Sequence, residues 1–338
     1  MPAKKKKQLD FVALGDITTD AFIQLKDVTV EKPDEHNHEQ KMLCMRFGDK
    51  IEYEDVVVVP AVGNSPNAAV SATRLGLNAA LATNLGSDKF GKEDIAALEK
   101  EGVNTDYVKV HKGKKSNYHY VLRFGAERTI LIKHWEYEYS LPDFETPPKW
   151  LYLSSLGENS IPFHHEIAEY LKKNKETKLA FQPGTFQIKL GHETLKDLYE
   201  ETEIFFCNKE EAQRILETDE DEIKYLLHGI HDLGPKMVVI TDGPKGAYAS
   251  ENGPGVWSMP MYPDPAPPVD RTGAGDSFSS TFTAAIALGK DIPTALSWGP
   301  INSMSVVQHI GAQAGLLTKK ELEKFLKDRP PHYEPKAI

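Results

Sequence analysis

The residues with the clearest chemical potential form one short run, Asp270-Arg271-Thr272-Gly273-Ala274-Gly275-Asp276. It precedes the stretch 277–288, whose apolar residues recur at helical spacing. Glycines at a helix start let the backbone approach a ligand and leave N–H groups without partners, so such an end attracts anions. An ionised Asp276 beside that anion site could accept a hydroxyl proton while the oxygen attacks phosphorus. Taken locally, the run fits an ordinary glycine-rich helix start equally well.

Other nucleotide-binding patterns are absent from the sequence. No Gly-x4-Gly-Lys-Ser/Thr loop occurs, and the pair Gly273-x-Gly275 has Phe278 where a third glycine would complete a dinucleotide motif. These absences argue against the P-loop and dinucleotide-binding classes.

The composition limits the class of protein further. The chain has 338 residues, of which 40% are hydrophobic and 27% charged, and its net charge is −10. Because nucleic-acid phosphates call for a basic surface, we expect no nucleic-acid partner. No apolar run reaches the roughly 18 residues of a membrane span, so we expect no membrane association. Two cysteines outside any paired motif fit a cytoplasmic protein.

Short apolar runs alternate with amphipathic stretches along most of the chain. Several runs are almost continuously apolar, which is typical of strands covered on both faces. Strands that alternate with helices predict a mostly parallel sheet with right-handed crossovers, and therefore an α/β sandwich. The runs are Phe11–Leu14, Ala79–Thr83, Leu151–Leu156, Lys178–Phe181, Ile204–Cys207 and Met237–Thr241.

Two β-rich insertions, at about 21–60 and 117–135, interrupt this alternation. The second predicts a hairpin, because apolar residues recur at every second position from Tyr118 to Phe124. The insertions predict a small lid over the edge of the sheet; the alternative is that they extend the main sheet.

Both ends of the chain are predicted to be tails that flank one large domain. Residues 1–9 are basic and predict a disordered tail. We expect one large domain over 10–330, which contains both insertions, and a second tail over 331–338.

The run from Asp270 to Asp276 resembles the C-terminal signature of the ribokinase-like (PfkB-type) carbohydrate kinases, Asp-Thr-Thr/Ser-Gly-Ala-Gly-Asp. Six of its seven positions match, and Arg271 replaces a threonine. The likeness extends from about residue 10 to residue 328. It implies a ribokinase-like three-layer α/β/α sandwich with a mostly parallel central sheet and a small β-rich lid. It further implies that Asp276 is the general base and that the N–H groups of Gly273, Ala274 and Gly275 form the anion hole.

Two earlier motifs correspond to the family's acceptor site. In the run Gly15-Asp16-Ile17-Thr18-Thr19-Asp20, the resemblance implies that Asp20 binds sugar hydroxyls. In Gly63-Asn64-Ser65-Pro66-Asn67 it implies acceptor contacts from Gly63 and Asn67. By themselves, these segments read as a loop aspartate and as a helix start with Ser65 as N-cap. Val62 stands where the family usually has another glycine.

Further motifs correspond to the nucleotide site. The run 208–211 resembles the family's Asn-x-x-Glu motif, which implies that Asn208 lies near the phosphates and that Glu211 reaches Mg²⁺ through water. The same four residues also spell a capping box. The run 241–246 resembles the nucleotide loop, and the resemblance assigns Thr241, Gly243 and Gly246 to it.

Two weaker assignments come from the same resemblance. Asn302 corresponds to the segment that lines the adenine pocket. Asp270 and Thr272 keep the residue types that hold a monovalent cation in some members, so K⁺ is a possible activator beside ATP and Mg²⁺.

The sequence therefore predicts a kinase that transfers the γ-phosphoryl group of MgATP to a hydroxymethyl group of a sugar such as ribose, fructose or ketodeoxygluconate. A nucleoside kinase is the alternative, because the run 181–184 departs from the Asp-Pro-Asn of sugar kinases and because Tyr118, Tyr120 and Phe124 could stack on a base or simply pack. A non-catalytic ligand-binding paralogue is the alternative of another class. Exposed lid edges suggest a homodimer.

Overall fold

The computed structural model describes residues 7–32, 41–125, 127–251 and 255–338. Most of the predicted basic tail therefore lies outside the described residues, as does residue 126 in the predicted hairpin turn. No helix in the described part of the chain has the length and apolar character needed to cross a bilayer.

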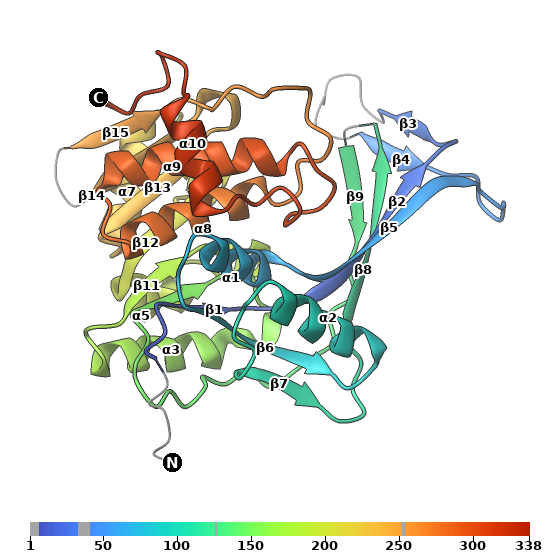
Figure 1. Ribbon diagram of the computed structural model, residues 1–338, viewed down its shortest axis with the longest axis horizontal. Coiled ribbons are helices and arrows are strands. Elements are labelled where there is room, and N and C mark those ends of the chain that lie inside the picture. Colours follow the sequence, from blue (N-terminus) through green and yellow to red (C-terminus); the bar gives the residue numbers. More distant parts are fainter. Residues whose placement is uncertain (1–6, 33–40, 126, 252–254) are drawn as a thin grey trace.

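The central sheet has ten strands in the described residues, in the order β16-β15-β14-β13-β12-β11-β10-β1-β6-β7 (Figure 1). The seven strands from β13 to β7 pair in parallel, and β14, β15 and β16 extend the sheet antiparallel. The parallel strands are β1 (Phe11–Leu14), β6 (Ala79–Gly86), β7 (Val108–His111), β10 (Trp150–Leu153), β11 (Lys178–Phe181), β12 (Thr202–Asn208) and β13 (Met237–Thr241). The antiparallel ones are β14 (Ala247–Glu251), β15 (Val256–Met259) and β16 (Lys336–Ala337).

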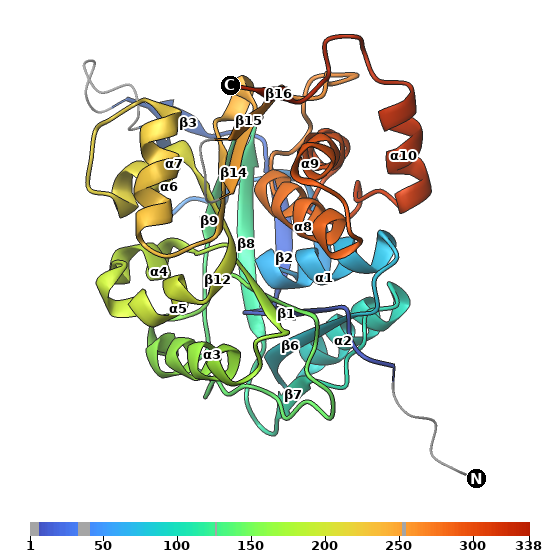
Figure 2. The ribbon, with the colours of Figure 1, turned by 90° about the vertical axis from the view of Figure 1, so that its left-hand side faces the viewer.

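Helices cover both faces of this sheet (Figure 2). One face carries α1 (Asn64–Arg74), α2 (Lys89–Lys100), α8 (Ala274–Ala287), α9 (Ile292–Val306) and α10 (Lys319–Lys327). The other carries α3 (Ile161–Lys173), α4 (Thr185–Leu190), α5 (Lys196–Glu200), α6 (Lys209–Ile215) and α7 (Ile223–Asp232). Three 3₁₀ turns accompany them: η1 (Glu158–Ser160), η2 (Glu193–Leu195) and η3 (Gly243–Lys245).

The strand β1 shows why the chain folds in three layers. Its four residues are all buried, and they alternate between two hydrophobic cores. Phe11 and Ala13 pack with the α1, α8 and α9 side, whereas Val12 and Leu14 pack with the α3 and α7 side. Period-two alternation of apolar residues on both faces requires a covering layer on each. The predicted mostly parallel α/β sandwich is confirmed.

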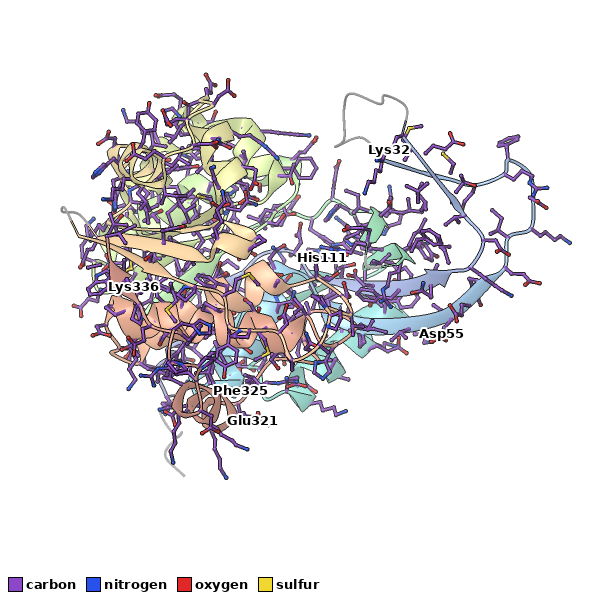
Figure 3. The ribbon with its side chains drawn as sticks, turned by 90° about the horizontal axis from the view of Figure 1, so that it is seen from above. Lys32, Asp55, His111, Glu321, Phe325 and Lys336 are labelled. Carbon is purple, nitrogen blue, oxygen red and sulfur yellow. The ribbon has the colours of Figure 1, made fainter. Side chains whose placement is uncertain are left out.

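The β-rich insertions form a sheet of their own instead of extending the central one. Its order is β5-β2-β8-β9, where β2 and β8 pair in parallel and the outer pairs are antiparallel. The strands are β2 (Thr18–Leu25), β5 (Tyr53–Val62), β8 (Asn117–Phe124) and β9 (Glu127–Leu131), and a short ladder joins β3 (Thr29–Glu31) to β4 (Met42–Cys44). Figure 3 shows this lid projecting from the body, with Lys32 and Asp55 on it and Lys336 on the far side of the molecule.

The C-terminal segment departs from the prediction that 331–338 is a tail. Tyr333 is fully buried, and its hydroxyl donates to the carbonyl of Ser297 at 2.6 Å. The strand β16 then pairs with β15 at the edge of the central sheet. Pro330 and Pro331 follow the end of α10, and the chain beyond them belongs to the fold.

Candidate active site

The start of α8 fixes the backbone around Asp276. Gly273 is the N-cap and has φ 80°, in the left-handed region that favours glycine. A Cβ at this position would lie 2.2 Å from the Cβ of Ala312. Glycine is therefore required here by both conformation and space, which explains the first glycine of the signature run.

The second glycine of the run, Gly275, is not required by the packing of the protein itself. A Cβ at this position would meet only Nε2 of Gln182, at 4.0 Å, so protein packing leaves the space open. Gly275 lines both of two neighbouring cavities, of ≈ 260 Å³ and ≈ 400 Å³. The backbone of Gly275 thus lies where a ligand can approach the helix start closely.

Three side-chain amides hold the carboxylate of Asp276. Asn64 donates to Oδ1 at 2.7 Å, Asn67 donates to Oδ2 at 2.9 Å, and Gln182 donates to Oδ1 at 3.2 Å. Burial raises the pKa of Asp276 above its usual value, and the bonds from Asn67, Asn64 and Gln182 oppose that rise. The result is a half-buried carboxylate that is oriented by three donors and has no lysine or arginine salt bridge among the described residues.

We call these two cavities the nucleotide-side cavities, after the nucleotide loop predicted at 241–246. The larger of them contains that loop. The cavity of ≈ 400 Å³ is lined by Thr241, Gly243 and Gly246, and its other walls are mainly apolar. These walls include Pro268, Phe278, Pro300, Met304 and Val307. A mainly apolar cavity beside a helix start is a suitable environment for a heteroaromatic ring.

The smaller cavity contains the predicted Asn-x-x-Glu motif. Asn208 and Glu211 line the cavity of ≈ 260 Å³ and also form a reciprocal capping box, with both bonds 2.8 Å long. Burial raises the pKa of Glu211. The capping bond uses Oε2 of Glu211, and Oε1 has no hydrogen-bond partner among the described residues. The motif is therefore a helix cap and a cavity wall at once.

The structure places Asn302 elsewhere than predicted. It is fully buried, its Nδ2 donates to Thr281 at 2.7 Å, and its Oδ1 accepts from the backbone of Leu317 at 2.9 Å. These bonds tie α9 to its neighbours, and Asn302 does not line the cavity. Ser303, Met304 and Val307, from the same region, take that position.

The first residues of the signature run form a turn. Asp270 is almost fully buried; its Oδ1 accepts from the backbone and the hydroxyl of Thr272, and its Oδ2 accepts from the backbone of Gly311. Arg271, the departure from the family pattern, is exposed and lines the larger nucleotide-side cavity.

On the acceptor side, Asp20 faces a residue that the sequence did not single out. Parallel pairing of β2 and β8 sets Asp20 opposite His119, and His119 Nδ1 lies 3.4 Å from Asp20 Oδ1. His134 Nδ1 lies 3.7 Å from Oδ2 of Asp16, which also accepts from the hydroxyl of Tyr139. No sequence pattern pointed to these histidines, because His119 is placed by the pairing of β2 with β8 and His134 by the path of the chain after β9.

The other residues predicted for the acceptor side, Gly63 and Asn67, take part in contacts within the protein itself. Gly63 has φ 119°, and a Cβ there would lie 2.9 Å from the carbonyl oxygen of Asp16, so glycine allows two backbone segments to approach. Both amide atoms of Asn67 are engaged, by Asp276 and by Gln313. Val62 is buried at the end of β5.

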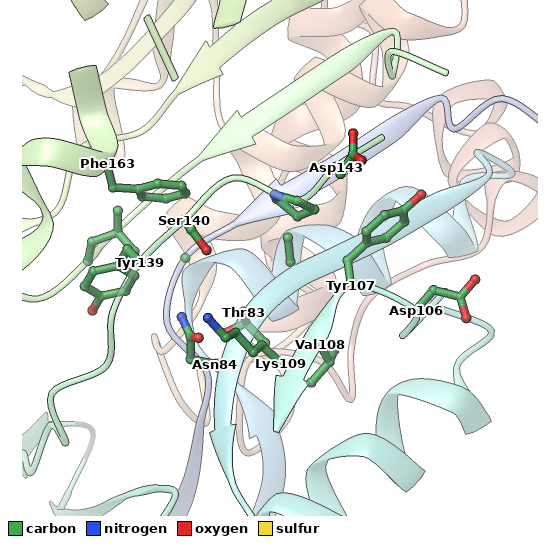
Figure 4. A pocket seen from close by; sticks show the side chains of 14 residues that line it. Thr83, Asn84, Asp106, Tyr107, Val108, Lys109, Tyr139, Ser140, Asp143 and Phe163 are labelled. Carbon is green, nitrogen blue, oxygen red and sulfur yellow. The ribbon is translucent and has the colours of Figure 1, made fainter. Parts of the chain in front are cut away.

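A further cavity, of ≈ 410 Å³, lies beyond Tyr139 and contains none of the predicted site residues (Figure 4). Thr83 and Asn84 of β6 line it together with Tyr139, Ser140 and other residues of the following segment. Tyr139 thus lines this cavity while its hydroxyl donates to the carboxylate of Asp16.

Comparison with known proteins identifies the family to which the chain belongs. A model of the pfkB family of carbohydrate kinases matches residues 36–319. The chain belongs to the pfkB carbohydrate kinase family. This confirms the resemblance inferred from the signature run, and with it the class of phosphotransferases that the motif predicts.

Individual relatives of this pfkB kinase span both sugar and nucleoside enzymes. A ribokinase of Bacillus subtilis is 28% identical over 272 residues, covering 78% of this chain and 87% of the relative. A nucleoside kinase of Methanothermobacter thermautotrophicus is 25% identical over 257 residues, covering 75% and 80%. The structure of Arabidopsis thaliana ribokinase complexed with ribose and ATP has a TM-score of 0.75 at 21% identity, covering 95% and 99%. The last likeness confirms the ribokinase-like fold.

Proposed function

We propose that this pfkB-family kinase transfers the γ-phosphoryl group of MgATP to a hydroxymethyl group of a sugar. The observation that carries the proposal is the position of Asp276. It lies at the start of α8, it is held by three amides, and Gly275 beside it lines both nucleotide-side cavities.

The step follows from this arrangement. The acceptor oxygen forms a bond to the γ-phosphorus while the bond to the β–γ bridging oxygen breaks, the hydroxyl proton passes to Asp276, and ADP leaves. Backbone N–H groups at the start of α8 face the charge that develops on the transferred group. Among the described residues the N–H of Ala274 makes only a long bond, of 3.4 Å, to the carbonyl of Arg271, so it retains capacity to donate to an anion.

The residues of the smaller cavity fit a magnesium ion held through water. Glu211 supplies a carboxylate oxygen and Asn208 an amide, and magnesium prefers oxygen ligands and retained waters. When bound, Mg²⁺ neutralises charge on the phosphates. Asp270 and Thr272 stay a proposed K⁺ site, because the buried carboxylate of Asp270 has no cationic side-chain partner among the described residues.

The side chains of the lid favour a sugar as the acceptor over a nucleoside. Tyr118 packs against Phe90 at 4.5 Å and against Tyr120 at 5.2 Å between ring centroids, so these aromatics are engaged on the outer side of β8. The inner side of the same strand presents polar residues, Asn117 and His119, and both are buried. Hydroxyl groups fit that polar surface better than the face of a base.

The outer surface of the lid supports a homodimer. Several large apolar side chains there are exposed, and apolar strand surfaces of this kind commonly become covered by a partner. They include Tyr53, Val56, Val58, Tyr120 and Leu131. Sedimentation of the full chain would test this, and a monomer at all concentrations would contradict it.

The kinase proposal is tested by ADP release with ribose, fructose, 2-keto-3-deoxygluconate, adenosine, inosine and cytidine as acceptors. We expect turnover with at least one sugar, and we expect Asp276→Asn to bind ATP normally while turnover falls by at least a thousandfold. Turnover only with nucleosides would favour the nucleoside kinase. No transfer to any acceptor would favour the non-catalytic paralogue.

A further inference from the structure

The cavity beyond Tyr139 takes no part in the proposed phosphoryl transfer. Its volume, ≈ 410 Å³, is within the range of pockets that bind small molecules. It shares no lining residue with either nucleotide-side cavity. Residues of β6 and β7 form one side of it, and residues 139–143 border it on the other (Figure 4). A ligand in this cavity would therefore not compete with a nucleotide for the same residues.

One end of the cavity gathers hydrogen-bond donors. Parallel pairing sets Asn84 of β6 beside Lys109 of β7, so both side chains leave the same face of the sheet. Oδ1 of Asn84 lies 2.8 Å from Nε2 of His111, which fixes the amide and leaves its NH₂ group to face the cavity. Figure 4 shows the ends of Asn84 and Lys109 near the hydroxyl of Ser140. An amide, an ammonium and a hydroxyl together suit a phosphate group.

The ammonium group of Lys109 is available to such a ligand. Lys109 is exposed, and it makes no ion pair or hydrogen bond to any residue that the structure describes. Burial, together with the charges of Lys109 and Lys114, lowers the pKa of His111, so that imidazole is neutral at neutral pH. Lys109 is therefore the cation at this end of the cavity.

The rest of the cavity differs in character. Asp106 and Asp143 line it as well, and Figure 4 shows both carboxylates away from Lys109 and Asn84. Carboxylate oxygens accept hydrogen bonds from sugar hydroxyls. Apolar surface completes the wall, from Pro142, Leu156 and Phe163. The cavity thus has donors and a cation at one end, and acceptors away from it.

We propose that this cavity is a second ligand site, for a monophosphorylated sugar, whose phosphate binds Lys109, Asn84 and Ser140 and whose hydroxyls donate to the carboxylates at the other end. Both parts of the ligand are needed, since inorganic phosphate lacks the hydroxyls and a free sugar lacks the charge. The site does not depend on the kinase activity, although the product of the proposed reaction belongs to this class of ligand.

Tyr139 connects the cavity to the acceptor side. Its ring lines the cavity and stacks on Phe163, with 5.8 Å between ring centroids. Its hydroxyl donates to the carboxylate of Asp16 at 2.9 Å and accepts from the backbone N–H of Gly157 at 3.1 Å. A ligand packed on this ring stabilises the conformation in which Tyr139 occupies the Asp16 carboxylate. Because Asp16 lies against Gly63 on the acceptor side, occupancy of the cavity should weaken acceptor binding.

The first test measures binding by calorimetry on the full chain, without turnover, with D-ribose 5-phosphate as the probe. We expect a binding event that weakens at least tenfold in Lys109→Gln. Lys112→Gln removes the same charge outside the cavity and should leave that event unchanged. No difference between Lys109→Gln and the unaltered protein would overturn the site. An equal loss in both variants would also overturn it, because general surface charge would then attract the phosphate.

The two ends of the cavity are tested separately. Asn84→Asp keeps the oxygen that faces His111 but replaces the NH₂ donor with a second oxygen, so it should weaken the same event at least tenfold. Asp143→Asn should weaken it about threefold. Inorganic phosphate, used as a probe on the unaltered protein, should bind at least tenfold more weakly than D-ribose 5-phosphate. Equal affinities would show that the sugar contributes nothing and would overturn the assignment to a sugar phosphate.

The last test concerns the connection through Tyr139 and uses a sugar that the protein phosphorylates. D-ribose 5-phosphate should raise KM for that sugar at least fivefold more in the unaltered protein than in Lys109→Gln, where only inhibition at the site of Asp276 remains. Tyr139→Phe keeps the ring and loses the hydroxyl, so it should bind the probe and lose the additional effect. Equal inhibition in all three proteins would overturn the connection. No turnover with any acceptor would overturn the kinase proposal, and calorimetry would still decide the second site.

Discussion

Gln182 donates to the carboxylate of Asp276 at 3.2 Å, and its own side-chain oxygen accepts from the hydroxyl of Tyr152. Tyr152 is fully buried in β10, so the amide of Gln182 cannot rotate its donor away from the base without breaking that second bond. The central sheet thereby positions the amide donor of Gln182 beside the carboxylate of Asp276. A donor of this kind favours the ionised form of the carboxylate.

Gln182→Leu should therefore raise the pKa of Asp276 further. The acid limb of the pH profile of kcat/KM is expected to move to higher pH, so the loss of activity is greatest in acid and smallest above neutrality. The measurement is the pH profile of sugar phosphorylation. Gln308→Leu is the control, since Gln308 bonds only the carbonyl of Ala266 in an exposed position. A uniform loss at every pH would contradict the pKa explanation.

Gly275→Ala separates the folding and ligand roles of the two signature glycines. Because a Cβ at Gly275 meets only Gln182 Nε2, the variant should fold with an unchanged melting temperature, yet the added methyl group occupies ligand space and should lower kcat/KM at least tenfold. Gly273→Ala should instead lower stability, because of its positive φ and the contact with Ala312. Gly255→Ala, in open space, should change neither property. Full activity in Gly275→Ala would contradict the close approach of a ligand.

Arg271→Thr restores the residue type that the family usually has. Arg271 lines the larger nucleotide-side cavity, and its charge acts on Asp264, which lines the same cavity. We expect KM for ATP to rise about three- to tenfold on removal of this cation, with the effect shrinking at high salt. Arg329→Thr, where the exposed guanidinium bonds a nearby carbonyl, is the control. An unchanged KM for ATP would leave Arg271 without a role in nucleotide binding.

Local patterns predicted the parts of the fold that depend on local physics. Apolar runs such as Phe11–Leu14 became buried strands, and the two-residue alternation around Tyr118 became a hairpin, because both patterns reflect burial on defined faces. The prediction that 331–338 is a tail is wrong. The segment is largely polar, but one of its side chains, Tyr333, is buried and bonds the chain to α9.

The candidate site shows the same difference between what local patterns predict and what depends on the whole fold. The run that holds Asp276 and Gly275 could be recognised because it is contiguous, whereas Gln182, which follows β11, and His119, in β8, lie far from it in the sequence. Asn302 lies in a segment that lines the cavity, but its own side chain points into the protein, and its neighbours form the cavity wall. A motif gives the segment, and side-chain direction depends on packing.

Asp94 links the roots of two lid strands through a buried carboxylate. Its Oδ1 accepts from the backbone of Ala61 at 2.7 Å and from the hydroxyl of Thr19 at 2.8 Å, and its Oδ2 is buried without a partner. Burial raises the pKa of Asp94 from 3.8 to about 6. The folded protein therefore binds this proton more tightly than the unfolded chain does.

Stability should consequently decrease as pH rises between 3.8 and about 6, and this contribution should be constant above that range. Asp94→Asn keeps an oxygen that can accept both bonds and removes the charge. Relative to the unaltered protein, its free energy of unfolding should increase by about 1 kcal/mol between pH 5 and pH 7. Urea unfolding at the two pH values measures this, with Asp55→Asn on the exposed part of β5 as the control. A difference between Asp94→Asn and the unaltered protein that does not vary with pH would mean that Asp94 is already ionised at little cost in the folded state.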